Sequence, residues 1–281
     1  MFLRRLSLFL TLALVAPLLH AEVKASQIDS QLRTLRSVPV DQKPAAIVKL
    51  AADIRSLPAN PQKVGYADAL VHLSTEGDMG KPTLQAVTDV LAAALAETPA
   101  PAKGDKVPMP YDDLAKLVRY EHVTTTMTDP LYAKAAQQLA DNDAALEKVD
   151  FTLKDLKGKK VTLSELRGKI VLVNFWATWC GPCRLEMADL DVVSRYFAPQ
   201  GLVVLSITDE DMFKVGSFFA TTSYTPIVLF DPGGKVHQQF HITGIPNTFL
   251  FGRDGKLLAV AIDQRTRRQF LEMLSKTDLH Q

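Results

Sequence analysis

A mostly apolar run from Ile170 to Trp176 leads within a few residues to Cys180-Gly181-Pro182-Cys183, which holds the only two cysteines of the chain. The run predicts a buried strand, and Pro182 is typical of the first turn of a helix. The two thiols therefore lie where a strand leads into a helix N-terminus, whose backbone N–H groups and dipole stabilise a thiolate. This setting requires an α/β unit and predicts a dithiol that forms and loses a disulfide reversibly.

Three other uses of the cysteine pair are weaker interpretations. A purely structural disulfide would close so short a loop that little chain entropy is removed. A zinc site would need His237 and His241, which lie too far along the chain for a zinc finger and fit a short solvated helix. A peroxidatic cysteine would follow a proline and a threonine at the offsets that Val173 and Ala177 occupy. We therefore expect no metal site and no peroxidase.

The N-terminus predicts export. Arg4 and Arg5 precede the apolar stretch Leu6–Leu19, and Ala21 offers a small residue for cleavage. This order is typical of a secretory signal, here at residues 1–21. Because the stretch is shorter than the ~20 residues of a spanning helix, an uncleaved membrane anchor is only the alternative. We expect a periplasmic or otherwise exported protein.

Charge and cysteine count narrow the function further. The formal net charge is +1, and without a basic run it gives no reason to expect a nucleic-acid partner. The chain carries no nucleotide-binding motif, so we expect no cofactor. Exported proteins often use paired cysteines as structural staples. Here both cysteines lie in one motif, so the core must be stable by packing alone.

Residues 22–148 predict an all-helical domain, to which the sequence assigns no role. In Pro44–Leu57, apolar residues recur at steps of three and four, and Pro44 falls in the first turn, where its missing N–H does no harm. Residues 98–110 are a proline-rich break, too stiff to be helical. The expected helices are Pro44–Leu57, Gly65–Ser74, Pro82–Glu97, Asp112–His122 and Pro130–Lys148.

Residues 149–281 predict a second domain in which strands and helices alternate. The expected strands are Phe151–Lys154, Lys160–Leu163, Ile170–Trp176, Leu202–Ile207, Ile227–Phe230, Thr248–Phe251 and Leu257–Ala261. The expected helices are Ser164–Gly168, Pro182–Phe197, Met212–Ala220, Lys235–Phe240 and Thr266–Lys276. Gly252-Arg253-Asp254-Gly255 has the composition of a hairpin turn. The pattern predicts an α/β fold, a mixed central sheet with helices on both faces, preceded by an all-α domain.

Glu186 is a candidate proton carrier. It falls with Cys183, Leu190, Val193 and Phe197 on one otherwise apolar stripe of the expected helix. Burial there would raise the pKa of its carboxyl toward values useful for acid–base chemistry. The alternative is an exposed glutamate that complements the helix dipole, and spacing alone does not decide between them.

Ile245-Pro246 stands at the entrance to an expected strand. Because proline cannot donate to a strand ladder, it must lie at the first residue or at an edge. If the Ile245–Pro246 bond is cis, the backbone of Ile245 is exposed beside the thiols, where an extended substrate could pair with it. Cis bonds are uncommon even before proline, so the residues alone favour trans.

Two motifs resemble the exported thioredoxins of the TlpA/ResA type. They are Asn174-Phe-Trp-Ala-Thr-Trp-Cys-Gly-Pro-Cys183, with the upstream run Leu163–Val173, and Gly244-Ile-Pro-Asn-Thr-Phe-Leu250. The resemblance covers 149–281 and says nothing of 22–148. It implies a thioredoxin fold with an added strand and helix at Ile227–Phe240, a cis Ile245–Pro246 bond and a reactive Cys180.

The resemblance also implies site roles. Family members of the ResA kind carry an active-site glutamate where this chain has Glu186. Where cytoplasmic thioredoxin has a buried aspartate, this chain has Asn174, which cannot carry a proton. The expected catalytic residues are Cys180, at the exposed helix start, the less exposed Cys183, and Glu186. We expect substrates to contact Trp179, Gly181, Pro182, Ile245 and Pro246.

The sequence thus predicts an exported thiol–disulfide oxidoreductase with a redox-active Cys180–Cys183 disulfide. No histidine lies between the cysteines, which favours a reductant nearer the ~−270 mV of thioredoxin than the ~−120 mV of DsbA. Its partners would be disulfide-containing proteins and a membrane electron donor, and the resemblance suggests cytochrome c maturation as one role. The alternative is a helical binding or scaffold protein, at 22–148, that carries a redox-sensing thioredoxin domain.

Overall fold

The computed structural model describes residues 25–220 and 223–280. The expected signal sequence and its cleavage site after Ala21 lie outside the described residues. The chain divides into two compact units. The first comprises Met1–Ser74 and Met79–Ala135, and the second comprises Thr75–Asp78 and Ala136–Gln281. Within the described ranges, no helix is both long enough and apolar enough to cross a bilayer.

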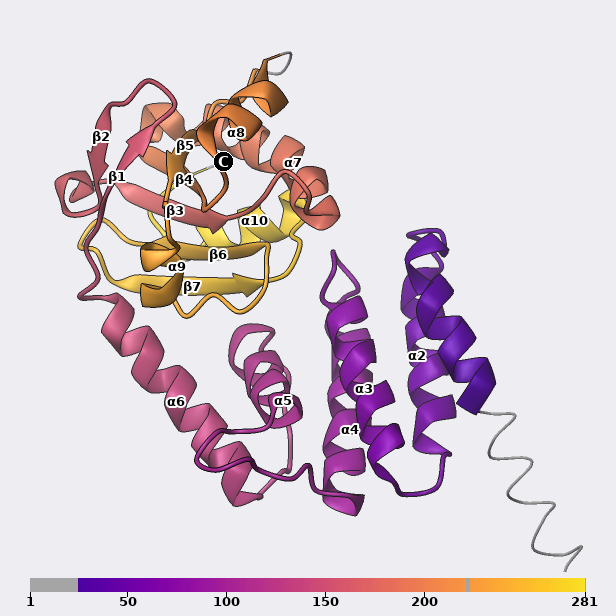
Figure 1. Cartoon of the computed structure of the whole chain (residues 1–281). Coiled ribbons are helices and arrows are strands. Elements are labelled where there is room, and N and C mark those ends of the chain that lie inside the picture. The colour runs from indigo at the N-terminus through magenta and orange to yellow at the C-terminus, as the bar shows by residue number, and fades with distance from the viewer. Residues whose placement is uncertain (1–24, 221–222, 281) are drawn as a thin grey trace, which may run out of the picture. The chain divides into compact units, whose positions relative to one another are not determined.

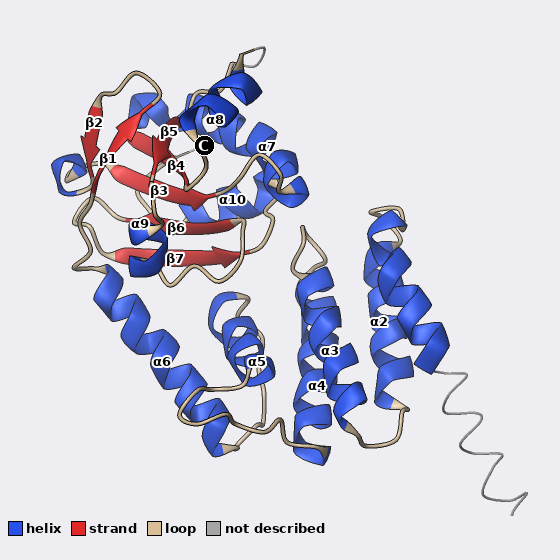
Figure 2. Cartoon of the chain, viewed as in Figure 1, coloured by secondary structure: helices blue, strands red, loops and turns tan. Residues whose placement is uncertain are grey.

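The first unit is helical, as predicted (Figures 1 and 2). Residues 25–34 are helical and are followed by a 3-10 turn at Leu35–Ser37. The further helices are α2 (Lys43–Arg55), α3 (Pro61–Ser74), α4 (Lys81–Glu97), α5 (Met109–Tyr120) and α6 (Pro130–Leu146), the last of which crosses the division between the units. The apolar positions of α2, including Ile47, Leu50 and Ile54, are buried.

Two helices begin earlier than predicted. α3 starts at Pro61 rather than at Gly65, and α5 starts at Met109 rather than at Asp112. In both cases a proline stands at or beside the helix start, where an N–H has no partner inside the helix anyway. The proline-rich break is therefore shorter than predicted, since Pro110 belongs to the first turn of α5.

The second unit alternates strands and helices. Its strands are β1 (Thr152–Asp155), β2 (Lys160–Thr162), β3 (Ile170–Phe175), β4 (Leu202–Thr208), β5 (Ile227–Phe230), β6 (Asn247–Phe251) and β7 (Leu257–Ile262). Its helices are α7 (Gly181–Phe197), α8 (Met212–Phe219), α9 (Lys235–Gln239) and α10 (Arg267–Leu274), with 3-10 turns at Ser164–Leu166 and Ala198–Gln200. Every predicted strand and helix is present, with bounds shifted by a few residues.

The seven strands form one mixed sheet in the order β2-β1-β5-β4-β3-β6-β7 (Figure 2). β3 pairs in parallel with β4, and β4 with β5. The pairs β1–β2, β1–β5, β3–β6 and β6–β7 are antiparallel. The predicted fold class, a mixed sheet of the thioredoxin kind preceded by a helical region, is confirmed.

β3 separates two packed layers because its side chains alternate between the faces of the sheet. Ile170 and Leu172 pack with α7 and α10 in one apolar cluster that includes Leu190 and Phe270. Phe175 points to the other face, where its ring lies 5.1 Å from that of Phe240, directly after α9. Residues of β3 are at most 3% exposed. The strand is therefore a rigid base for the loop that follows it.

Candidate active site

The cysteine pair lies at the N-terminus of α7. Cys180 is the N-cap residue, and its Sγ accepts a hydrogen bond from the backbone N–H of Cys183 at 3.2 Å. The two cysteines form a disulfide, with Cα atoms 5.3 Å apart. Pro182 occupies the first turn of the helix, as predicted. When the disulfide is reduced, the same N–H groups and helix dipole favour a thiolate at Cys180.

The cysteines are less exposed than predicted. Cys180 is only 4% exposed and Cys183 is fully buried, so the order of exposure is right but the expected open position of Cys180 is wrong. The reason is local packing. In the disulfide state Cys180 belongs to an apolar cluster with Trp176 and Val215, and Ile245 packs against that cluster. In the disulfide state, neighbouring side chains therefore cover most of both cysteines.

Trp179 stands directly before Cys180 in the sequence. Its side chain is 67% exposed, although the other tryptophan, Trp176, is 1% exposed. Trp176 packs against the rings of Phe218 and Phe219 at 5.7 and 5.5 Å, which accounts for its burial. A large exposed ring beside a reactive sulfur is suited to apolar contact with a protein substrate. That role for Trp179, and for Gly181 and Pro182, stays a prediction.

The loop before β6 lies against the disulfide. The Ile245–Pro246 bond is cis, as the resemblance implied. The carbonyl oxygen of Ile245 lies 3.7 Å from Cys180 Sγ, so the fold joins two motifs that are 65 residues apart in sequence. Pro246 is buried and stands directly before the first residue of β6. The backbone of Ile245 is thus placed beside the sulfur, where an extended substrate could pair with it.

Glu186 lies on the buried face of α7, one turn after Cys183, and is 1% exposed. Its Oε1 accepts a hydrogen bond from Asn174 Nδ2 at 2.8 Å, and its Oε2 accepts one from the backbone N–H of Arg265 at 2.9 Å. Burial raises the pKa of Glu186 to about 8, although these hydrogen bonds oppose the shift. The prediction of a desolvated carboxyl is confirmed, and the exposed alternative is wrong.

Asn174 connects Glu186 to the sheet. Its Nδ2 also donates to Thr248 Oγ1 at 3.0 Å, so one amide bridges β3, α7 and β6. Sequence reasoning identified Asn174 only as a departure from thioredoxin and missed both Thr248 and the Arg265 backbone. Neither residue carries a local signal, because Thr248 meets Asn174, and the Arg265 N–H meets Glu186, only after the sheet and the loop after β7 have formed.

Glu210 was also missed, and it supports the loop before the cysteines. Its carboxylate accepts hydrogen bonds from Thr178 N at 2.5 Å and Thr178 Oγ1 at 2.9 Å, and it forms an ion pair with Lys214. Burial alone would raise the pKa of Glu210, but the bonds from Lys214 and Thr178 hold it below its usual range. The acid therefore stays charged and fixes the segment just before Trp179.

The two histidines considered as metal ligands lie in different surroundings. His237 Nδ1 lies 2.8 Å from Asp231 Oδ2, and the ring packs edge-on against Phe175 at 4.8 Å. His241 is exposed and lies beyond the end of α9. The expectation that both sit on a short solvated helix is therefore wrong: His237 lies on α9 but is packed and bonded, and His241 is exposed but lies beyond the helix.

Comparison with known proteins covers the second unit. Residues 145–260 match the model of the AhpC/TSA family. The thiol-disulfide oxidoreductase ResA of Bacillus thuringiensis subsp. konkukian is 31% identical over 131 residues, which cover 46% of this chain and 76% of that protein. ResA of Bacillus subtilis is 31% identical over 118 residues, 42% of this chain and 66% of that protein. Among solved structures, a thiol:disulfide interchange protein of the thioredoxin family from Chlorobium tepidum is 28% identical, with a TM-score of 0.42, and the match covers 45% of this chain and 91% of that one.

Proposed function

Because the chain belongs to the family of the ResA thiol-disulfide oxidoreductases, we propose that it is an exported reductase of protein disulfides that works through Cys180 and Cys183. The observation that carries the proposal is the Cys180–Cys183 disulfide at the start of α7, with the Ile245 carbonyl 3.7 Å from Cys180 Sγ. A disulfide at a helix N-terminus is readily reduced and reformed, because the helix stabilises the thiolate that attacks or leaves.

The reaction takes two exchanges. In the reduced protein, the Cys180 thiolate attacks one sulfur of a substrate disulfide, and the other substrate sulfur leaves as a thiolate that takes up a proton. Cys183 then attacks Cys180 Sγ and expels the second substrate thiolate. Two electrons have passed to the substrate, and the protein holds the Cys180–Cys183 disulfide of the present structure. A membrane electron donor would return two electrons.

Glu186 fits a proton-transfer role in the second exchange. Cys183 is buried and must lose its proton before it can attack, yet no water-exposed base stands on its helix face. Glu186 follows one turn later on that face, and its pKa of about 8 lies close to the usual pKa of a thiol. A carboxyl group with that pKa is available as a base, and can accept the thiol proton, at mildly alkaline pH.

The direction and the substrates are also proposals. Gly181 and Pro182 place no imidazolium beside Cys180, so the reduced form lacks the extra stabilisation that makes a strong oxidant. We therefore assign the protein to disulfide reduction, in the periplasm or an equivalent compartment, with oxidised proteins such as those of cytochrome c maturation as substrates. A peroxidase is disfavoured because Val173 and Ala177, both buried, stand where a peroxidatic site needs proline and threonine.

Two matched variants test the proposal. The purified chain, reduced beforehand, should reduce insulin, whereas Cys180→Ser should reach only the background rate. Cys183→Ser should instead accumulate a mixed disulfide with the substrate through Cys180, visible as a mass shift that dithiothreitol reverses. Equal insulin reduction by the parent and Cys180→Ser would refute the proposal. Trapping by Cys180→Ser rather than Cys183→Ser would reverse the assigned roles.

A further inference from the structure

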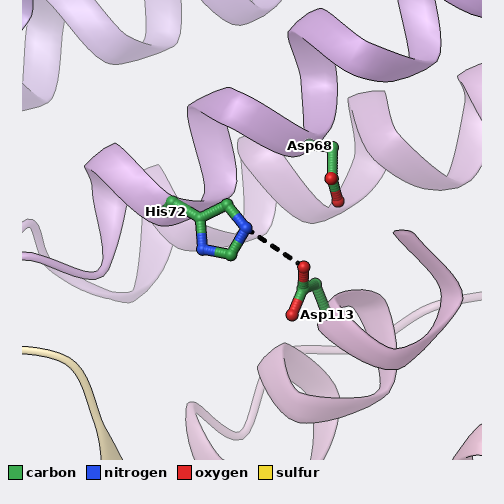
Figure 3. A group of neighbouring side chains, drawn as sticks. All are labelled: Asp68, His72 and Asp113. Atoms are coloured by element: carbon green, nitrogen blue, oxygen red, sulfur yellow. Dashed lines mark ion pairs between the residues drawn. The ribbon is translucent and has the colours of Figure 1, made fainter. Parts of the chain in front are cut away.

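Three potential ligand side chains converge in the first unit, far in sequence from the cysteines. Asp68 and His72 lie one turn apart on α3, and Asp113 lies on α5. One ligand atom from each residue lies within 4.8 Å of the others. Figure 3 shows the carboxyl group of Asp68 and the ring of His72 both directed toward Asp113.

Asp68 is the observation that points to a ligand. The residue is 7% exposed, and its Oδ1 is buried with no hydrogen-bond partner among the described residues. A buried carboxylate oxygen without a partner is costly, because it has lost its water and gained nothing in return. Asp113 is 4% exposed and carries a second negative charge beside it. Such an arrangement calls for a positive charge between the two acids.

The Asp113 carboxylate is held so that one of its oxygens faces the other two candidate ligand residues. Its Oδ1 accepts from Lys116 Nζ at 3.3 Å, and Lys116 is shared with Asp112, whose Oδ2 lies at 2.7 Å. Its Oδ2 lies 3.1 Å from His72 Nε2. Lys116 thus orients the Asp113 carboxylate from behind, as groups outside a metal's own ligands commonly do.

We propose that Asp68, His72 and Asp113 bind one divalent transition-metal ion, with Zn²⁺ as the representative. Two carboxylates and an imidazole are a common donor set for such ions, whereas Mg²⁺ and Ca²⁺ prefer oxygen ligands alone. Zinc holds nitrogen and oxygen at about 2.0–2.2 Å, so two of its ligand atoms lie about 3.4 Å apart. His72 Nε2 and Asp113 Oδ2, 3.1 Å apart, already fit this spacing, and a small adjustment would bring in the Asp68 oxygen, since the three atoms lie within 4.8 Å of one another. The His72 side chain, 49% exposed, provides both that movement and an entry path from solvent.

The sequence contains a weak signal for this site. Asp68-Ala-Leu-Val-His72 puts a carboxylate and an imidazole at positions i and i+4 of a helix, the spacing by which helices present paired ligands. The third ligand comes from another helix, 41 residues after His72, so the sequence alone does not reveal it. The competing interpretation is an ion-pair network completed by Lys116, with Asp68 protonated and no metal.

The test uses the full chain without a histidine tag, with the Cys180–Cys183 disulfide formed and the absence of free thiols verified. Under these conditions the cysteines cannot bind metal. Isothermal titration with Zn²⁺ should give one site per chain, and an excess of Mg²⁺ should not displace the ion. Asp68→Asn and His72→Gln should each weaken Zn²⁺ binding by at least about tenfold. At one Zn²⁺ concentration, the melting temperature of the parent chain should rise by more than that of either variant.

His237→Gln is the matched control. His237 also lies beside a buried carboxylate, that of Asp231, but among the described residues it belongs to no cluster of three potential ligands, so its loss should leave Zn²⁺ affinity unchanged. No binding by the parent, or equal affinity in the parent and His72→Gln, would overturn the proposal in favour of the ion-pair network. If Asp68→Asn fails to fold, His72→Gln decides alone, because that half-exposed side chain can be replaced without opening the core.

Discussion

Asn174 Nδ2 donates a 2.8 Å hydrogen bond to Glu186 Oε1, and this bond fastens the middle of the sheet to the helix that carries the disulfide. Both residues are 1% exposed. An amide at this position of β3 can hold the glutamate in place, but it cannot exchange a proton with it. The arrangement leaves Glu186 as the titratable group beneath the disulfide, with a pKa raised to about 8 by burial.

The first prediction concerns the pH dependence of turnover. Glu186→Gln keeps the size of the side chain and removes its proton chemistry, so insulin reduction should fall by about 10²-fold at pH 8. The parent and the variant carry the same two cysteines. The ratio of the two rates therefore isolates Glu186 and should rise as the pH passes through about 8.

Asp189→Asn is the control for that experiment. Asp189 lies on α7, three residues after Glu186, and is partly exposed. Its carboxylate accepts a hydrogen bond from the backbone N–H of Arg267. Its replacement should leave the pH profile unaltered. A rate ratio for Glu186→Gln that stays flat from pH 6 to about 9.5 would rule out proton transfer through Glu186.

The second prediction concerns stability. The folded-state pKa of about 8 lies above the usual value of 4.5 for Glu186, so the folded protein holds this proton more tightly than the unfolded chain. The contribution of Glu186 to the free energy of unfolding is therefore full below pH 4.5 and is lost as the pH rises to about 8. Glu186→Gln lacks this loss, so the stability of the parent relative to the variant should fall by at most ~5 kcal/mol between pH 4.5 and 8.

Tryptophan fluorescence is the measurement to use for that comparison. Trp176 and Trp179 are the only tryptophans of the chain and both lie in the second unit, so their signal reports the unfolding of that unit. A second buried acid titrates in the same range, because burial and the nearby Asp113 raise the pKa of Asp68 to about 7. Asp68 lies in the first unit, so a signal from the second unit keeps the effect of Glu186 separate from that of Asp68. A stability difference that does not change between pH 5 and 8 would contradict the prediction.

Much of this architecture could be predicted because its signals are local. The strand at Ile170–Phe175, the helix after Cys180 and the buried stripe with Glu186 all follow from the spacing of apolar residues. Contacts that require the folded sheet left no such trace, as the bonds from Arg265 N to Glu186 and from Thr178 to Glu210 show. The low exposure of Cys180 was missed for the same reason, since the residues that cover it are distant in sequence.

The third prediction concerns the reduction potential. Pro182→His would place an imidazole between the cysteines at the start of α7, where its cationic form stabilises the Cys180 thiolate and hence the reduced state. The potential should rise by roughly 20–60 mV, since about 30 mV corresponds to 1.4 kcal/mol for a two-electron couple. Equilibration with glutathione buffers measures both proteins. An unchanged or lower potential in the variant would contradict this account.

The last prediction concerns Glu210, which we regard as a positioning residue. Glu210→Gln keeps the shape of the side chain but replaces one charged acceptor of Thr178 by an NH₂ group and breaks the ion pair with Lys214. We expect about 1–3 kcal/mol of lost stability at pH 7. The segment before Trp179 should also loosen, raising KM for insulin more than it lowers kcat.

Lys214→Met separates the two contributions of Glu210, because it removes the ion pair and leaves both Thr178 bonds in place. The Lys214 side chain is 55% exposed, so its loss should cost less than about 1 kcal/mol and should not affect KM. The lowered pKa of Glu210 stabilises the fold above the usual value of 4.5, and this gain disappears as the pH falls through and below it. The stability gap between the parent and Glu210→Gln should therefore narrow in acid. A gap that widens in acid would contradict the lowered pKa of Glu210. A KM shared by both variants would show that Glu210 acts only through its ion pair with Lys214.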